Sequence, residues 1–193
     1  YICQRAAEAI IADIGPFRLS NDALQTINLF LDEFLAVLLL TATQLDLVRI
    51  KAAVIQLLPH YSLGKNALVE AELELKQQLE SSKSINNLQQ PPQHDFSTYE
   101  KMRSLTIGTV MVYVTAIVEH IAEYLLNAVA MMADRVNADY IKVKEVLYTL
   151  IEDPQVGNLF RRMNLKETLE VRRNGKNLYT NRLCSNDQLY LVS

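Results

Sequence analysis

The chain has little glycine, proline or cysteine: its 193 residues include five glycines, five prolines, two cysteines and no tryptophan. So few glycines and prolines argue against a loop-rich all-β protein and favour helices. Cys3 and Cys184 are far apart and lack a Cys-x-x-Cys spacing, so we expect neither a disulfide framework nor a zinc site, and a reduced, intracellular setting. Because the chain starts at Tyr1 rather than at a methionine, we also expect it to be a piece of a longer protein.

A basic excess and a long uncharged apolar run are also missing. The formal net charge is -3, whereas proteins that neutralise nucleic-acid phosphates usually carry a clear positive excess. Asp32 and Glu33 interrupt one apolar stretch, and Glu119, His120 and Glu123 interrupt another. Neither stretch reaches the roughly 18–20 uncharged apolar residues of a membrane span, so the sequence predicts a soluble protein.

Catalytic signatures are missing as well. The sequence contains no G-x-S-x-G, Walker, H-E-x-x-H or dinucleotide-binding glycine pattern. Glu119, His120 and Glu123 have a spacing that a carboxylate-bridged metal site can use, but such sites draw further ligands from other helices. The two remaining histidines are His60, beside a proline, and His94, in a polar linker. We therefore expect no enzyme activity, no metal and no cofactor.

Helical periodicity divides the first half of the chain into elements of unequal length. Residues 3–14 predict a short helix, and residues 20–43 a long one that is apolar on nearly all sides, with Ser20 or Asn21 as its N-cap. Leu47–Ile50 reads as an extended strip, followed by a compact helix that Pro59 ends. An amphipathic helix follows over residues 62–82.

The second half repeats this order after a polar linker. Residues 97–105 predict a short helix, and a loop is expected around Gly108. A long helix then runs from about Thr109 to Arg135. Tyr140 to Lys142 reads as extended and precedes another compact helix, and Pro154 starts a last short one.

This repeated layout resembles the histone fold. Val112, Tyr113, Ala116, Glu119 and Ile121, followed by "YIKVKEVLYTLIEDPQVGNLF", resemble the core histone that carries the nucleosome's acidic patch. The stretch "SNDALQ" with "VYVTAIVEHIAEYLL" resembles the double histone domain at the amino end of the Ras exchange factor Son of sevenless.

The resemblance implies an all-α protein in which two histone folds of one chain form an intramolecular handshake pseudodimer, a monomer in solution. Its implied divisions are a first fold (1–59), a connecting helix (60–82), a flexible linker (83–96), a second fold with a short carboxyl-terminal helix (97–163) and a polar basic tail (164–193). The two long helices should bury apolar side chains against each other: Leu31, Phe34, Leu38, Ile117 and Leu125.

The resemblance also suggests contact residues. Nucleosomal histones insert arginines from the strip before the last helix into DNA; here the second half has Asp139 in that region, while the first half keeps Arg49 and Lys51 as candidate DNA contacts. Glu119 and Asp153 align with the acidic patch, and Glu123 lies one turn from Glu119. These three acids form a candidate residual docking patch.

The carboxyl-terminal part is locally basic and suggests contact with an anionic partner, such as lipid headgroups, an acidic protein face or nucleic acid. Its candidate residues are Arg161, Arg162, Lys166, Arg172, Arg173 and Lys176.

Three functions follow as hypotheses. The first is a non-catalytic docking module of a larger intracellular signalling or scaffold protein, which restrains a neighbouring domain or binds a protein partner. The second is a histone-fold component of chromatin or transcription that contacts DNA. The third is peripheral contact with an anionic membrane through the basic cluster. The sequence leaves cytoplasm and nucleus both open.

Overall fold

A computed structural model describes residues 2–59, 62–86 and 97–165, with side chains described outside 82–86 and 97–105. This part of the chain is mostly helical, which confirms the all-α class predicted from the sequence. Its elements in chain order are α1 (Gln4–Ile11), β1 (Arg18–Leu19), α2 (Asn21–Ala42), α3 (Leu47–Leu57), α4 (Leu63–Asn86), α5 (Ser97–Arg135), β2 (Tyr140–Ile141), α6 (Val143–Glu152) and α7 (Gly157–Arg162).

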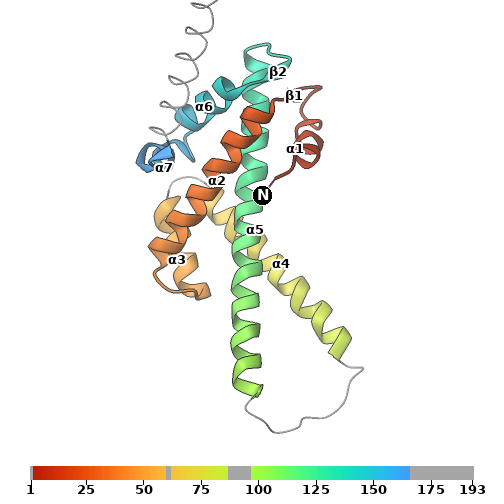
Figure 1. Ribbon diagram of the computed structural model, residues 1–193, viewed down its shortest axis with the longest axis vertical. Helices are drawn as coiled ribbons and strands as arrows, with labels where there is room; N and C mark the ends of the chain where they lie inside the picture. Colours follow the sequence, from red (N-terminus) through yellow and green to blue (C-terminus); the bar gives the residue numbers. More distant parts are fainter. Residues whose placement is uncertain (1, 60–61, 87–96, 166–193) are drawn as a thin grey trace, which may run out of the picture.

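The helices are arranged around α5 (Figure 1). α2 crosses α5 at an angle, and α4 packs against α5. α1 lies beside the upper part of α5, while α6 and α7 lie on the other side of α2. α5 contacts α1, α2, α3, α4 and α6, so it is the central helix of the described fold.

Side-chain caps fix the start of α2 and the start of α3. The Ser20 hydroxyl accepts a hydrogen bond from the Ala23 backbone N–H at 3.1 Å, as the sequence predicted for the N-cap of α2. Thr43 ends α2 in the left-handed region with φ 60°, and Asp46 Oδ1 then accepts from the Arg49 N–H at 2.9 Å. This second cap starts α3 at Leu47. The predicted extended strip over Leu47–Ile50 is therefore wrong.

The predicted break near Gly108 is also wrong, because α5 is one helix from Ser97 to Arg135. Glycine in a helix interior costs about 1 kcal/mol relative to alanine. This cost is offset by the packing of α4 against α5. On α4, Leu63, Ala67 and Ala71 are buried at intervals of one turn, and the two alanines allow the helices to approach closely.

A short parallel pairing joins the two halves of the chain. Arg18 lies opposite Tyr140, and Leu19 lies opposite Ile141. The ladder continues into α2, because the Ser20 N–H donates to the Ile141 carbonyl at 2.9 Å. Leu19 and Ile141 are buried, and Arg18 and Tyr140 are exposed. The extended conformation predicted around residues 140–142 is confirmed at Tyr140–Ile141.

One continuous hydrophobic core fills the space between the described elements. Leu31, Phe34, Leu38, Ile117 and Leu125 are all fully buried, as predicted. Burying a side chain of this size stabilises a fold by about 1.5–3 kcal/mol. The core therefore contains the central residues of both long helices.

The end of the described chain belongs to this core. Phe160 of α7 packs against Phe30 of α2, with ring centroids 6.3 Å apart. After α7, the Asn164 N–H donates to Glu33 Oε1 at 2.6 Å, and Leu165 is buried. These contacts hold α7 and the residues that follow it on α2.

Two helices are long and apolar enough to cross a membrane, judged by length and composition alone: Asn21–Ala42 and Thr106–Arg135. In the apolar stretch of each helix, 44% and 50% of the residues respectively are buried inside the fold, and core helices of soluble proteins can be as long and as apolar. The expectation that neither helix spans a membrane stays a prediction.

Candidate docking surface

An apolar groove of about 630 Å³ lies between α1, α2 and α5. Asn28 of α2 fixes one end of its α1 wall: it accepts a hydrogen bond from the Ile2 N–H at 3.1 Å and donates one to the Ile2 carbonyl at 3.0 Å. The described lining residues are Ile2, Cys3, Ala6, Ile10, Leu31, Leu35, Val114, Thr115, Val118, Glu119, Ala122 and Glu123.

The three acids predicted to form one docking patch do not line one site. Glu119 and Glu123 are exposed on α5 and line the groove. Asp153 lies at the end of α6 and lines a separate depression of about 160 Å³ between α5 and α6. The two sites lie on different faces of α5. Glu123 lines the groove, whereas Tyr124, the next residue, points to another face of the helix and is hydrogen-bonded to Asp153.

Asp153 organises the turn between α6 and α7. Its Oδ1 accepts from the backbone N–H groups of Gln155 at 2.8 Å and Val156 at 3.0 Å. Its Oδ2 accepts from the Tyr124 hydroxyl at 2.7 Å. Burial, together with this bond, raises the pKa of Tyr124 to about 12. The carboxylate therefore holds local structure as well as facing the depression.

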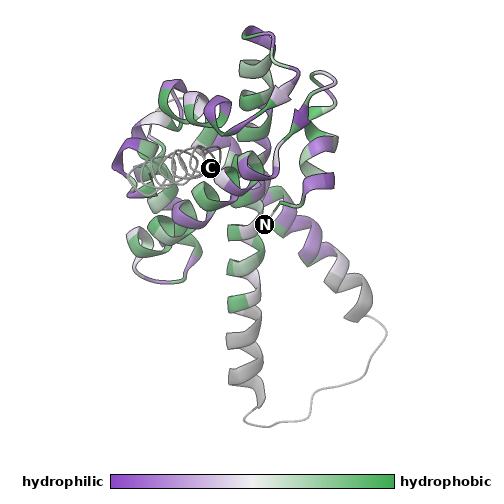
Figure 2. Cartoon of the chain, turned by 45° about the horizontal axis from the view of Figure 1, so that its top comes forward, coloured by the Kyte–Doolittle hydropathy of each residue, from purple (hydrophilic) through white to green (hydrophobic). Residues whose placement is uncertain are grey.

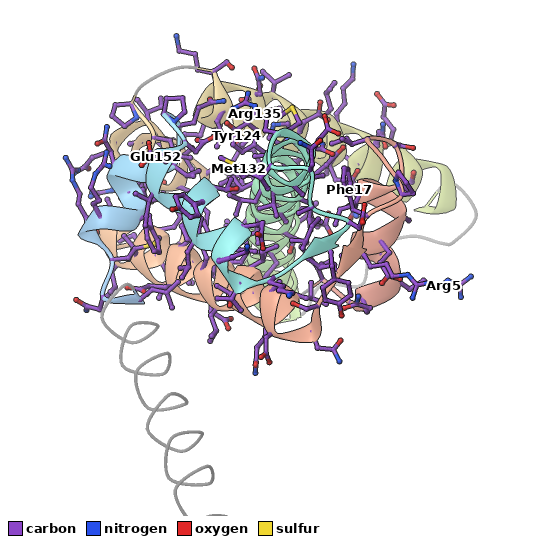
Figure 3. The ribbon with its side chains drawn as sticks, turned by 90° about the horizontal axis from the view of Figure 1, so that it is seen from above. Arg5, Phe17, Tyr124, Met132, Arg135 and Glu152 are labelled. Carbon is purple, nitrogen blue, oxygen red and sulfur yellow. The ribbon has the colours of Figure 1, made fainter. Side chains whose placement is uncertain are left out.

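The smaller depression has a sulfur-rich wall and charges of both signs. Figure 3 shows Met132, Arg135 and Tyr124 close together, with Glu152 to one side, whereas Phe17 and Arg5 lie across the molecule. Met131, Pro154 and Thr149 complete much of its lining. With both a cation and acids at its edge, this depression has no clear preference for a ligand charge.

The two candidate DNA contacts lie on α3 and differ in their surroundings. Lys51 Nζ is 2.6 Å from Glu72 Oε1 of α4 and 5.7 Å from the centroid of the Tyr113 ring. This cation is thus partly neutralised by an intramolecular partner. Arg49 is exposed, and its Nη1 lies 3.5 Å from Thr43 Oγ1.

Tyr113 lies beneath this ion pair. It is fully buried, and its hydroxyl has no hydrogen-bond partner among the described residues. Burial, followed by the negative charge of Glu72, raises the pKa of Tyr113 to about 12. Lys51, Glu72 and Tyr113 thus link α3, α4 and α5 by charge and ring contacts.

Only two members of the predicted basic cluster fall within the described residues. Arg161 and Arg162 are exposed at the end of α7. Arg161 donates to the Ile151 carbonyl at 3.2 Å and to Asn158 Oδ1 at 2.8 Å. Lys166, Arg172, Arg173 and Lys176 lie outside the described residues, and so does most of the predicted tail.

The turn between α2 and α3 exposes an apolar tip that the sequence analysis did not single out. Leu40 and Val48 are each 77% exposed, and Leu45 and Ile55 are also more than half exposed. Figure 2 shows hydrophobic residues continuing along α5 beyond the crossing helices. A cluster of exposed apolar side chains of this kind is typical of an interaction surface.

The apolar wall of the groove was equally missed, although part of the signal was present. Ala6 and Ile10 are four residues apart within the predicted helix over residues 3–14, and both line the groove. The helical periodicity of residues 3–14 does not indicate that α1 packs against α5. That packing depends on contacts between residues more than a hundred positions apart.

The described residues contain no group of three or more histidine, cysteine, aspartate or glutamate side chains placed to hold a metal ion. The chain matches no protein-family model and no curated protein.

Proposed function

We propose that the chain is a double histone fold whose halves clasp each other within one polypeptide. The observation that supports this most directly is the parallel pairing of β1, just before α2, with β2, just after α5. Such a pairing joins the start of one long helix to the end of the other, as a head-to-tail arrangement requires. The crossing of α2 and α5 through a shared core supports the same arrangement.

The two ends of the proposed pseudodimer differ. At the other end, the residues expected to form an extended strip, Leu47–Ile50, belong to α3, and α5 continues as a helix past Gly108, where a loop was expected. In the described residues, β1–β2 is thus the single strand pairing. The apolar tip at Leu40, Leu45 and Val48 lies at this unpaired end.

The clasp is tested by dividing the chain. Residues 1–86 and 97–193, expressed together as separate polypeptides, should purify as a one-to-one complex because their shared core is large. The uncut chain should behave as a single particle of 21.9 kDa in light scattering. Halves that fold independently, or an uncut chain that is an obligate dimer, would contradict the proposal.

We further propose that the chain acts as a non-catalytic docking module of a larger intracellular protein and holds a neighbouring domain or a protein partner on its surface. The observation that carries this proposal is the apolar groove of about 630 Å³ with an acidic rim. Neutralisation of Lys51 by Glu72 and the net charge of -3 make nucleic-acid phosphates a poorer fit.

The docking function is tested by adding the purified chain to the domains encoded beside it in the full-length gene. We expect saturable binding at moderate ionic strength. Binding to a DNA duplex with a steep salt dependence would support the chromatin hypothesis instead. Binding to anionic but not neutral vesicles, lost in Arg161→Glu/Arg162→Glu, would support the membrane hypothesis.

A further inference from the structure

The groove between α1, α2 and α5 has the shape of a seat for a short helix. Its lining residues on α5 run from Val114 to Glu123, which corresponds to about 14 Å along the helix axis, or about two and a half turns. Leu31 and Leu35 of α2 form the opposite wall. A groove with helical walls and apolar lining of this length is typical of sites that bind the apolar face of an amphipathic helix.

The charge of the groove selects among such helices. Glu119 and Glu123 are the charged side chains among its described lining residues, and no lysine or arginine is among them. They lie four residues apart on one helix face and are exposed. Like charges at this spacing destabilise a helix by a few tenths of a kcal/mol. Within the described part of the chain, neither forms an ion pair.

We propose that this groove binds a positively charged amphipathic helix of a partner protein. Apolar side chains of that helix would pack on the partly exposed Ile10, Leu35 and Val118, and a lysine or arginine beside them would lie between Glu119 and Glu123. That cation relieves the repulsion of the two acids. The inference rests on the proposed docking function and names the chemistry of the partner.

Cys3 lines the groove as an exposed, free cysteine and provides a direct probe of occupancy. In the full chain with Cys184→Ser, Cys3 is the remaining thiol of the two cysteines. A designed leucine–lysine amphipathic peptide of about 14 residues should slow alkylation of Cys3 by N-ethylmaleimide in a saturable manner. A peptide of the same composition with the helical period scrambled should not, and neither should a leucine–glutamate peptide.

The matched variants separate the groove from general charge attraction. Glu119→Gln/Glu123→Gln should raise the Kd of the lysine peptide about tenfold at low ionic strength, as expected for two exposed ion pairs. Asp13→Asn/Glu70→Gln makes the same change in net charge at exposed positions that do not line the groove and should leave the Kd unchanged. Circular dichroism melting of each variant verifies that it is folded.

Several results would overturn the inference. One is a Cys3 that the peptide does not protect; another is an equal loss of affinity in the groove and control variants. Protection of Cys3 from alkylation that increases with protein concentration in the absence of peptide would show that a second copy of the chain occupies the groove. If neighbouring domains bind while the peptide fails, the groove inference falls and the docking function stands; if neither binds, both fall.

Discussion

Tyr124 in α5 and Asp153 after α6 are joined by a hydrogen bond of 2.7 Å from the phenol to the carboxylate. The same carboxylate accepts two backbone N–H groups of the next turn. One side chain therefore connects the central helix to the entrance of α7, and its loss affects three hydrogen bonds at once.

We expect Asp153→Ala to reduce the free energy of unfolding by about 2–3 kcal/mol, because it removes a turn cap and leaves the partly buried Tyr124 hydroxyl without its acceptor. Asp153→Asn keeps one oxygen for the backbone groups and should cost about half as much. Urea unfolding followed by circular dichroism measures both changes. Equal stability of the alanine variant and the parent would contradict this role for Asp153.

Tyr113 and Tyr124 should ionise later than ordinary tyrosines. In the folded chain the pKa of each is raised to about 12, chiefly by burial, whereas unfolded tyrosine ionises near pH 10. Since the folded pKa is the higher one, the protonated phenols contribute their stability fully below about pH 10 and lose it as the pH rises towards 12.

Absorbance at 295 nm across this range measures the ionisation. Tyr113 and Tyr124 should ionise at the high end of this range, and Tyr113→Phe should remove one of these two transitions. The phenylalanine also eliminates a buried hydroxyl without a described partner, so unfolding stability near pH 7 should stay equal or rise by about 1 kcal/mol. A marked loss of stability at neutral pH would show that the hydroxyl is satisfied.

The strand pairing predicts that Leu19 and Ile141 stabilise the fold together. Both are buried and lie opposite each other. Leu19→Ala and Ile141→Ala should each cost about 2–5 kcal/mol. Because the two side chains lie in one contact, the double variant should cost less than the sum of the single variants. Thermal or urea unfolding of the parent, the two single variants and the double variant measures these changes in the free energy of unfolding. Strict additivity of the two single changes would mean that the two positions are energetically independent. Tyr140→Ala, at an exposed position of the same strand, serves as the control.

The helix caps predict smaller and independent effects. Ser20→Ala and Asp46→Ala should each lower the free energy of unfolding by about 1 kcal/mol. Since they cap different helices at distant points of the chain, the double variant should be additive within about 0.5 kcal/mol. Ser20→Asp, which retains a capping oxygen, should restore most of the loss. A Ser20→Ala variant as stable as the parent would show that the hydroxyl contributes nothing to α2.

Local rules predicted the parts of the fold that depend on short stretches of sequence. The Ser20 cap follows from the residue preferred before an apolar helix. The burial of Phe34 and Leu38 follows from apolar residues on nearly every side of the first long helix. These features depend on neighbours within a few positions, so one sequence was enough to find them.

The same rules failed where two local preferences compete. Leu47–Ile50 contains two β-branched residues and reads as a strand, but the Asp46 cap and the burial of Ile50 favour a helix. Gly108 reads as a break, yet a single glycine costs too little to interrupt a helix that packs along another. The groove depends on the packing of α5 against α1 and α2, which lie far from it in the sequence, so no short window could reveal it.

α5 contains about 58 Å of uninterrupted helix and contacts α1, α2, α4 and α6. Helices from both halves of the chain therefore share this one rod, so a substitution that bends α5 would disturb both halves at once.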